Sequence, residues 1–374
     1  MNNIKHIEHF EDAVIATPVL AQLAITQLIW QIRNGKGNVS KKVDGSPAVV
    51  FGLDRADNPQ VHDPRLWVST KSFFNKNPLK FYSVKDIEES GKDEEVKAKL
   101  KTLFKALRPG ELDLSYIYTG DLLWAHPSDW AHDDYNHTIS VTPNVVTYTF
   151  KLEDVVGKKV GIAIHPEFYK ARLGGMQGKG DDSRKLVDLK KSKNIHVVDL
   201  DFYGSGMDEL VRPLQQLWTI LSGGNSPKNK YMYVPSISSD LLKYYKSWRV
   251  AIALGHAARG RFPQFVRYKI KKHIETLKTQ AAKDRWLEKA DAIILEYNKV
   301  GPTIDPLYDW ASAIKEEVIN KFDEHNDLQA SIESRFSLNN PIKGGEGYVV
   351  DTGFGLIKLV RNEFKRANKS GIHR

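Results

Sequence analysis

The stretch "KKVDGSPAVVFG", residues 41 to 52, decides how the rest of the chain is interpreted. Two lysines, an aspartate and a glycine stand directly before an apolar run that has the composition of a β-strand. Because side chains two residues apart point to the same face of a strand, Lys42 shares its face with Asp44 and not with Lys41. Lys42 is therefore either a charged residue at the start of a surface strand or a nucleophile directed into a pocket.

The second interpretation makes chemical demands on Lys42. A lysine amine attacks phosphorus only when it is deprotonated, so its ordinary pKa of about 10.4 must fall through burial or a neighbouring cation. Lys41 adds positive potential, Asp44 could orient the amine or take its proton, and Gly45 lets the backbone approach a ligand closely. The pattern K-x-D-G is short, so both interpretations stay open at this point.

The distribution of apolar residues predicts an α+β fold. Residues 1 to about 36 are expected to form one or two helices, and a charged helix is expected at 86–107. Three-and-four spacing predicts helices from about 206 to 336, and strand character returns at 344–360. The other strand-like runs are 48–52, 66–74, 114–124, 144–152, 159–169 and 194–202.

The simplest organisation is a β-rich core that is interrupted by a helical insertion. In this division, 1–205 hold the N-terminal helices and most of the core, 206–336 form the inserted helical domain, and 337–374 contain the last core strands and a basic tail. The polar, glycine-containing segment 172–185 is predicted to be a mobile loop, and the basic end, 365–374, a frayed tail.

Composition narrows the setting of the protein. The chain has no cysteine, which excludes disulfides, thiolate metal sites and thiol nucleophiles and fits a reducing, cytoplasmic location. The uncharged segment 13–32 has the length of a membrane span, but Thr17, Pro18 and three glutamines interrupt it and acidic residues precede it. We therefore expect a buried amphipathic helix and no membrane partner. Neither common glycine-rich phosphate-loop pattern occurs, and the oligomeric state stays open.

Positive charge is concentrated in one part of the chain. Residues 241–290 contain 13 Lys and Arg against three acidic residues, a local charge of +10, whereas the whole chain carries +9. Such a field suits a polyanion, of which nucleic acid is the commonest. The predicted nucleic-acid-binding residues are Lys243, Lys246, Arg249, Arg259, Arg261, Arg267, Lys269, Lys271 and Lys272.

Aromatic residues are interleaved with these cations: Tyr244, Tyr245, Trp248, Phe262, Phe265, Tyr268 and Trp286. Aromatic side chains can stack on exposed bases while the cations neutralise phosphates. The alternative is that most of them fill the core of the insertion and leave the cations on its solvated face.

Three other stretches place a charged residue at or in an apolar strand. "YTGDLLW" has Asp121 after a glycine, "GGEGYVV" has Glu346 between glycines, and "GLIKLV" has Lys358 inside an apolar run. A strand-interior lysine is costly to bury unless it pairs with a negative group. Singly, Asp121 and Glu346 are explained as turn residues and Lys358 as an edge-strand charge that prevents aggregation. Together, in this order after "KVDG", they favour a common site.

These stretches resemble the motifs of the covalent nucleotidyltransferase superfamily, which contains ATP-dependent DNA ligases, RNA ligases and mRNA capping enzymes. "KVDG" is similar to motif I, "GDLLW" to motif III, "EGYVV" to motif IV and "IKLV" to motif V, and "VSTKSFFNK" stands where motif Ia would. The resemblance covers about 42–200 and 344–360. It implies an antiparallel β nucleotidyltransferase core of the ligase adenylation-domain type. The signature K-x-D-G-x-P-A also resembles uncharacterised tailed-phage proteins, which implies a phage-encoded protein in the host cytoplasm.

The resemblance implies a reaction with ATP. Lys42, assisted by Asp44, would attack the α-phosphate and form a lysyl-AMP, and the AMP would pass to a 5′-phosphate end of RNA or DNA. Lys358 would hold the α-phosphate from the side opposite pyrophosphate. Glu346 would bind Mg²⁺ or Mn²⁺, and Asp121 would contact the ribose or help to orient the metal.

The resemblance also implies further contacts to the nucleotide. They are assigned to Ser40, Lys41, Gly45, Ser46 and Lys71. The base would be covered by a strand that follows motif III, for which two alternatives stay open: Tyr148 and Phe150, or Ile162 and Ile164.

Departures from the family pattern keep other functions open. Pro47 stands where ligases usually carry arginine or asparagine, Asp121 replaces the usual glutamate, and Val360 replaces a second lysine of motif V. After Val360 we expect no C-terminal OB domain. The alternatives are a nucleic-acid-binding protein that keeps the fold without catalysis, and a transferase that moves AMP or GMP onto an RNA end or another acceptor without sealing. RNA or DNA as substrate, and ATP or GTP as nucleotide, stay open.

Histidines form two further clusters. His126, His132 and His137, with two aspartates, follow motif III, and their spacing is more typical of a loop than of a metal site. "HIEH", residues 6 to 9, is expected to start a helix, although it could fold back near the pocket.

Overall fold

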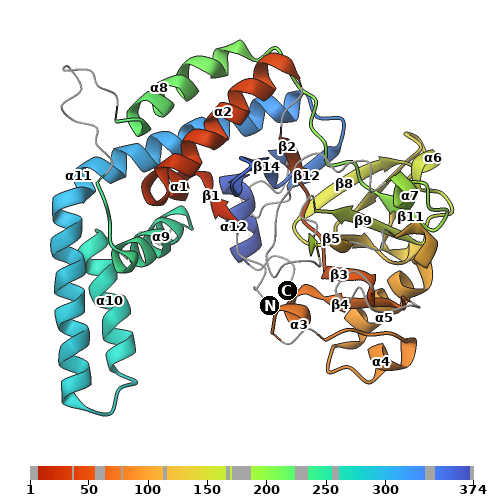
Figure 1. Cartoon of the computed structure of the whole chain (residues 1–374), viewed down its shortest axis with the longest axis horizontal. Coiled ribbons are helices and arrows are strands. Elements are labelled where there is room, and N and C mark those ends of the chain that lie inside the picture. The colour runs from red at the N-terminus through yellow and green to blue at the C-terminus, as the bar shows by residue number, and fades with distance from the viewer. Residues whose placement is uncertain are drawn as a thin grey trace.

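The computed structural model describes residues 7–35, 38–54, 64–76, 79–112, 116–165, 169–170, 187–223, 235–254, 261–332 and 342–370. Within them the chain is an α+β protein with three sheets, in which most strand pairs are antiparallel. The predicted α+β class is confirmed. The long axis separates a helical half from a sheet-rich half (Figure 1). Arg259 and the segment 172–185 lie outside the described residues.

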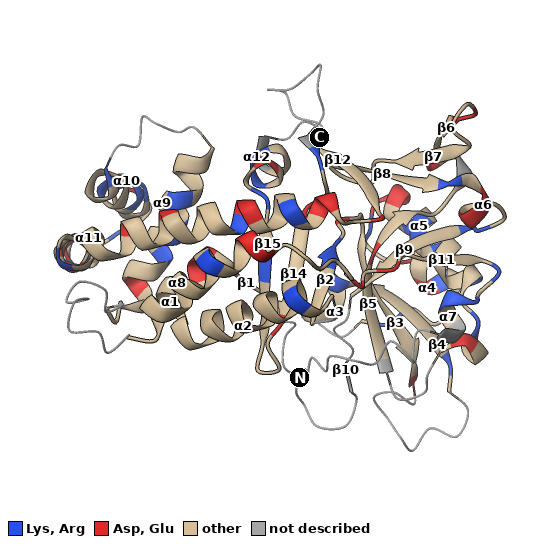
Figure 2. Cartoon of the chain, turned by 90° about the horizontal axis from the view of Figure 1, so that it is seen from above, with Lys and Arg blue, Asp and Glu red and all other residues tan. Residues whose placement is uncertain are grey.

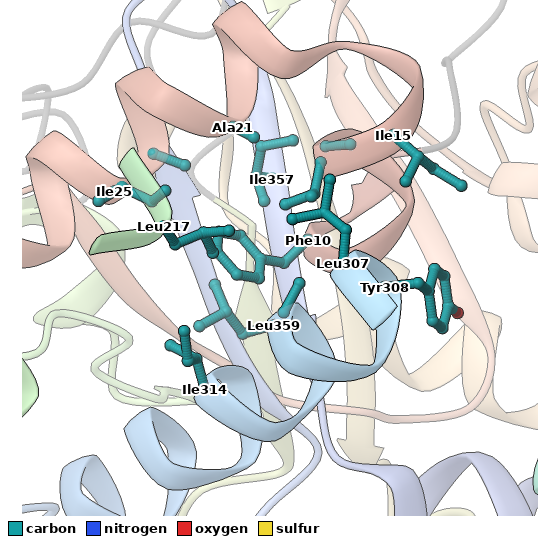
Figure 3. Packing of buried hydrophobic residues seen from close by; sticks show 14 of the residues in the cluster. Phe10, Ile15, Ala21, Ile25, Leu217, Leu307, Tyr308, Ile314, Ile357 and Leu359 are labelled. Atoms are coloured by element: carbon teal, nitrogen blue, oxygen red, sulfur yellow. The ribbon is translucent and has the colours of Figure 1, made fainter. Parts of the chain in front are cut away.

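Sheet A lies between the two halves of the molecule (Figure 1). Its strand order is β1 (Glu8–His9), β15 (Leu356–Val360), β14 (Gly347–Asp351) and β2 (Val39–Lys42). One face of this sheet is covered by the helices α1 (Phe10–Ala16), α2 (Pro18–Asn34), α8 (Val211–Leu221) and α11 (Gln280–Glu324). Ile357 and Leu359 of β15 pack there against Phe10 and Leu307 (Figure 3). Burial of this face leaves the other face for polar side chains.

The helical half extends away from sheet A. The helices α9 (Ser239–Ala253) and α10 (Phe262–Ile274) pack against α11. Helix α11 changes direction along its length (Figure 1) and contains Pro302 and Pro306, each of which removes a backbone hydrogen bond and bends a helix. A short 3-10 turn, Asp208–Leu210, precedes α8.

Sheet B forms the centre of the other half. Its strand order is β11 (Ile195–Val197), β9 (Val160–Ile164), β5 (Tyr116–Trp124), β3 (Ala48–Leu53) and β4 (Leu66–Thr70), and β10 (Tyr169–Lys170) also pairs with β5. The helix α5 (Glu94–Ala106) packs with Leu100 and Leu103 on one face of this sheet. The shorter helices of this region are α3 (Lys71–Lys76), α4 (Val84–Glu88) and α7 (Val187–Lys190), with a 3-10 turn at Pro109–Glu111.

Sheet C completes the β part. Its strand order is β13 (Ile342–Lys343), β12 (Gln329–Ile332), β8 (Val146–Lys151), β7 (Thr138–Val141) and β6 (Ala131–Asp133). The remaining helices are α6 (Leu152–Val155), α12 (Asn362–Ser370) and a 3-10 turn at Pro127–Asp129. Strand β12 follows α11 directly and pairs with β8, and the N-terminal helices pack on α11 and α8. The division at 205 and 336 stays a prediction.

Three local expectations have a clear outcome. The strand expected at 66–74 ends at Thr70, and Lys71 begins α3. The frayed tail expected from 365 is wrong as far as Ser370, because α12 packs Phe364 and Ala367 into a buried cluster. The segment 13–32 forms two helices that meet at Thr17. In the described part of the chain, no helix combines the length and the apolar character needed to cross a bilayer.

Buried charge ties the N-terminal segment to the end of the chain. Lys315 of α11 is 0% exposed, and its ammonium lies 3.1 Å from Glu11 Oε1 and 3.1 Å from Glu316 Oε1. It also donates a hydrogen bond to Asn362 Oδ1, at 3.0 Å, and Lys365 pairs with Glu11. Burial alone raises the pKa of Glu11, but the two ammonium groups outweigh it and lower that pKa.

Replacement of Leu359 with alanine tests the packing of sheet A on the helices. Leu359 is 0% exposed, so Leu359→Ala should lower the free energy of unfolding by about 2–5 kcal/mol through lost burial and a cavity. Urea unfolding followed by circular dichroism measures the change. Phe354 precedes the same strand and is 86% exposed, so Phe354→Ala should stay within about 0.5 kcal/mol of wild type. Equal losses for the two variants would contradict the packing described above.

Candidate functional site

The polar face of sheet A carries two of the three predicted catalytic residues. The strands β2, β14 and β15 lie side by side, and their register forms rows of paired residues across the sheet. One row consists of Lys42, Gly347 and Val360. The neighbouring row on the same face consists of Ser40, Val349 and Lys358. Paired residues of neighbouring strands point to the same face. Lys42 and Lys358 therefore share the face that the helices leave open.

Glu346 is the direct partner of Lys42. It precedes β14, and its Oε2 lies 2.5 Å from Lys42 Nζ, with side-chain exposures of 6% for Glu346 and 19% for Lys42. Burial alone would lower the pKa of Lys42, but Glu346, followed by Asp121 and Asp44, outweighs it and raises that pKa. Lys42 is therefore held as an ammonium ion in this arrangement.

Glycines allow the elements of the site to approach closely. A Cβ on Gly45 would lie 2.4 Å from the carbonyl oxygen of Leu122 in β5, and Ser46 N donates a hydrogen bond to that same oxygen at 2.9 Å. The loop after Lys42 is thus docked on sheet B beside Asp121. Gly347, the first residue of β14, has φ +144°, and a Cβ there would lie 1.9 Å from Leu359 O. Only glycine therefore fits at this position, directly after Glu346.

Asp121 approaches the site from sheet B. Its Oδ2 lies 3.0 Å from His165 Nε2, and its Cα is paired with those of Ala48 and Ala163. Burial raises the pKa of Asp121, but His165, Lys42 and Lys71 outweigh it and lower that pKa. Asp121 is therefore an ionised carboxylate within electrostatic reach of Lys42 and of Lys71.

The pKa of Asp44 lies well above the ordinary value for an aspartate. Its Oδ2 accepts a hydrogen bond from Asn144 Nδ2 at 2.5 Å, and its backbone N–H donates to the hydroxyl of Tyr148 at 2.7 Å. Burial, and then the negative charge of Glu346, raise the pKa of Asp44 to about 7. A carboxyl group with this pKa can exchange a proton near neutral pH.

Lys358 differs from Lys42 in its surroundings. Within the described ranges its ammonium makes no hydrogen bond or ion pair, although it lies within electrostatic reach of Glu346 and Lys42. Burial, and then the positive charge of Lys42, lower the pKa of Lys358. A half-buried lysine of this kind is suited to an anionic ligand.

One of the five predicted phosphate-side and sugar-side contacts, Lys41, does not face the site. Lys41 lies on the helix-covered side of sheet A, where its ammonium is 2.5 Å from Asp327 Oδ1 and 3.4 Å from Asp199 O. The two-residue period of β2 turns Lys41 away from Lys42, so the structure does not bring it to the site, and its assignment to the nucleotide stays a prediction. Ser40, Gly45, Ser46 and Lys71 lie at the site or next to it.

Neither alternative for covering the base offers an open surface. Ile162 and Ile164 point to the α5 side of sheet B, opposite to the side of Asp121, so the structure does not bring them to the site, and this alternative stays a prediction. Tyr148 and Phe150 are 1% and 8% exposed and belong to the core of sheet C. Only the hydroxyl of Tyr148 reaches the site, through Asp44.

The predicted metal ligands come from two sheets. Glu346 belongs to sheet A and Asp121 to sheet B, and both influence the titration of Lys42. Two carboxylates fit Mg²⁺, because this ion takes most of its ligands from water and substrate phosphates. In the portions of the chain that the structure describes, no three His, Asp or Glu residues are arranged as a metal site, and this includes His126, His132 and His137.

The basic surface of the helical half is smaller than predicted. Lys246 pairs with Glu8 at 2.8 Å and with Asp12 at 3.8 Å, and Arg249 pairs with Asp309 and lies over the ring of Tyr308. These two cations are engaged by acidic residues of the protein itself, and their assignment to nucleic acid stays a prediction. The exposed members of the predicted set are Lys243, Arg261, Arg267, Lys271 and Lys272, with Lys269 half-buried. They belong to α9 and α10 or their edges, at the end of the molecule away from sheet B (Figure 2).

The aromatic residues of this region are mostly structural. Tyr245, Trp248, Phe262 and Phe265 are buried in the core of the helical half, as the alternative interpretation predicted. Tyr268 is the most exposed of the seven, at 39%.

Three residues near the site were not among the predicted site residues. His165 follows β9 directly and pairs with Asp121, Asn144 holds Asp44, and His9 of β1 is paired in register with Lys358. His165 could have been found from its position after an apolar strand. Asn144 and His9 are brought to the site by tertiary packing, for which the sequence has no local signal.

The chain belongs to a family of unknown function, DUF6267, whose profile matches residues 2–370. No curated protein and no solved structure matches the chain.

Removal of the negative charge from Glu346 should change the titration of Lys42. In Glu346→Gln the burial of Lys42 is opposed by less negative charge, so the pKa of the amine should fall below its wild-type value. Measurement of amine reactivity against pH, with the modified lysine identified by mass spectrometry, gives that pKa. Glu95→Gln, which removes an exposed partner of Lys99, is the control and should leave Lys42 unchanged. An unaltered pKa in Glu346→Gln would show that the ion pair does not control Lys42.

Proposed function

We propose that this member of a family of unknown function is an ATP-dependent nucleotidyltransferase of the polynucleotide-ligase type. The observation that carries the proposal is the ion pair between Lys42 and Glu346, which are 304 residues apart in the chain. Asp121 and Lys358 also lie within electrostatic reach of Lys42. The four residues that the motif resemblance selects from distant stretches thus converge on one site.

The arrangement of the sheets supports the same proposal. The polar face of sheet A, with Lys42 and Lys358, meets the side of sheet B that carries Asp121 through the docked loop at Gly45. We infer that these sheets form the antiparallel core of a nucleotidyltransferase, with α8 to α11 as the helical addition. A nucleotide held at this junction would have its phosphates beside the two lysines and its sugar towards Asp121.

The proposed first step uses Lys42 as the nucleophile. The amine attacks the α-phosphorus of ATP, an N–P bond forms, the P–O bond to the β-phosphate breaks, and pyrophosphate leaves. The amine must first lose its proton, and Asp44, with a pKa of about 7, is the group that can accept it near neutral pH. Because Glu346 keeps Lys42 charged, Glu346 must be drawn away from the amine before the attack.

Glu346 and Asp121 would hold Mg²⁺. The ion would supply neutralisation of the charge on the phosphates. Engagement of Glu346 by the cation would also weaken its pair with Lys42, which favours the neutral amine. Lys358, whose ammonium has no ion-pair partner among the described residues, would bind phosphoryl oxygens.

In the second part of the proposed reaction, an oxygen of a 5′-phosphate of RNA or DNA attacks the phosphorus of the lysyl-AMP, the N–P bond breaks, and Lys42 regains its free amine. A 3′-hydroxyl would then attack the 5′-phosphate and displace the AMP. The exposed cations of α9 and α10 would bind the phosphate backbone through charge neutralisation. Because they lie at the end of the molecule away from sheet B, they would contact nucleic acid at a distance from the reacting end (Figure 2).

A second candidate function is nucleic-acid binding without catalysis. The raised pKa of Lys42 favours it, since a nucleophilic amine must be neutral. Val360 points to the polar face of sheet A in the row of Lys42, where a second motif V lysine would stand. The absence of a lysine at this position also favours nucleic-acid binding without catalysis. A transferase that modifies an end without sealing it would share the first step and differ only in the acceptor.

Labelling with α-³²P-ATP and Mg²⁺ tests the covalent step. Wild-type protein should carry label on a denaturing gel, and Lys42→Arg should carry none, because arginine keeps the charge but is not a nucleophile. Lys41→Arg is the matched control and should keep the label, since Lys41 faces the helices. GTP in parallel identifies the nucleotide.

The outcomes separate the candidates. Absence of label from folded wild-type protein that carries no AMP from expression would contradict the nucleotidyltransferase proposal and favour nucleic-acid binding alone. Label with transfer to a 5′-phosphorylated oligonucleotide, but without joining to a 3′-hydroxyl, would favour the end-modifying transferase.

Neutralisation of the exposed lysines of α10 tests the nucleic-acid surface. Lys271→Gln with Lys272→Gln should weaken binding of a long oligonucleotide and reduce the salt dependence of its affinity by about two phosphate contacts. A short oligonucleotide that reaches only the site should bind as before. Fluorescence anisotropy at several salt concentrations measures both. Lys85→Gln with Lys151→Gln, on exposed lysines of the sheet-rich half, is the control. Equal losses in the two double variants would rule out a specific role for α10.

A further inference from the structure

Strand β1 brings a histidine next to Lys358. It pairs in parallel with β15, and His9 is the register partner of Lys358. Register partners of neighbouring strands point to the same face, so His9 extends the polar face of sheet A beyond Lys358 and away from Lys42. The sequence stretch "HIEH" thus reaches the site through its last residue.

The imidazole of His9 has an unused nitrogen. Its Nδ1 is buried and has no hydrogen-bond partner within the described parts of the chain. His9 occupies the residue before α1, but its side chain makes no capping hydrogen bond. Buried polar groups are normally paired, so an orphaned nitrogen in a polar site calls for an explanation.

The charges that face His9 are mainly positive. Lys358 comes from β15, Lys365 from α12 and Lys315 from α11, and Glu11 of α1 is the nearby negative group. Burial, and then Lys365 and Lys358, lower the pKa of His9 to about 2, so the ring is neutral. Glu11 is already engaged by Lys315 and Lys365, whereas Lys358 is engaged by no described residue.

We propose that His9 and Lys358 together bind a second phosphoryl group, beyond the one that Lys42 attacks. This inference rests on the proposed function for its substrate. A phosphoryl group between the imidazole and the ammonium would accept a hydrogen bond from each and would balance the excess of positive charge. The negative charge of the phosphoryl group would also make protonation of the His9 imidazole easier. A protonated imidazole has a second N–H donor for the bound group.

Two molecules of the proposed reaction could supply this phosphoryl group. One is the pyrophosphate portion of the nucleotide, which would place Lys358 on the pyrophosphate side of the α-phosphate and not on the opposite side that the motif resemblance implies. The other is the 5′-phosphate of the nucleic-acid end, which agrees with the opposite side. Both present the same chemistry to His9 and Lys358, so the experiment uses one probe for each source: inorganic pyrophosphate, and a short oligonucleotide with either a 5′-phosphate or a 5′-hydroxyl.

Imidazole NMR on the full-length protein tests the proposal directly. His9 is assigned by the signal that disappears in His9→Gln, and in wild-type protein this signal should move when pyrophosphate or the 5′-phosphorylated oligonucleotide is added. By calorimetry, His9→Gln and Lys358→Ala should each weaken binding of the same probe about tenfold or more, the effect of a lost hydrogen bond to a charged group. His132→Gln, at an exposed histidine of β6, should bind like wild type.

Each outcome has a defined meaning. A response to pyrophosphate alone identifies the nucleotide as the source, and a response that requires the 5′-phosphate identifies the nucleic-acid end. A His9 signal that stays still with every probe, or a Lys358→Ala loss without a His9→Gln loss, overturns the role of His9. None of these measurements requires the covalent step, so failure of the labelling experiment and failure of this inference can be told apart. If His9→Gln does not fold, His9→Phe, which keeps a ring but removes both nitrogens, replaces it for the assignment and for calorimetry.

Discussion

The buried ion pair between Glu11 and Lys315 is the interaction on which the arrangement of the site depends. A buried charge without a partner is strongly destabilising, so the contact between Glu11 and Lys315 stabilises the packing of α1 on α11. Lys365 and Asn362 complete the pair from α12. With α1 held in this way, β1 is placed on the edge of β15, and the site gains a fourth strand.

A second constraint acts from the sheet-rich half. The missing side chain of Gly45 lets the loop after Lys42 lie against β5, and the missing side chain of Gly347 lets β14 approach β15 directly after Glu346. The charged residues are therefore positioned by backbone contacts as well as by their own pairing. An ion pair as close as that of Lys42 and Glu346 needs this support, because its charges are largely removed from water.

Much of the site could be predicted because its signals are local. The two-residue period of a strand is enough to separate Lys42 from Lys41, and motif similarity to a known superfamily selects Glu346 and Lys358, which the structure brings near Lys42. The motif similarity also assigns Lys41 to the nucleotide, whereas the two-residue period places Lys41 on the other face of β2 from Lys42. Ile162 and Ile164 could not be oriented from sequence, because β9 is buried on both faces and its apolar run has no polar side.

Other features of the structure depend on partners that lie far away in the chain. The cations of 241–290 are visible in the composition, but Lys246 is engaged by Glu8 and Asp12, more than 200 residues earlier. His9 reaches Lys358 through a strand of only two residues, which is too short for any periodicity. Pairings of this kind follow from the packing of helices on sheet A and cannot be read from a local pattern.

Sheet A also determines when the pair of Lys42 and Glu346 can form during synthesis of the chain. It combines strands from the beginning of the chain with β14 and β15 from near its end, and Lys42 is separated from Glu346 by 304 residues. At about 5–20 residues per second, the ribosome works for roughly 15–60 s after it has made β2 before the partner of Lys42 exists. During that interval β2 has an unpaired edge in place of β14, and neither Glu346 nor Lys358 has been made. A chain that is released before Glu346 is made therefore lacks the partner of Lys42, and sheet A can form only after β14 and β15 have been synthesised.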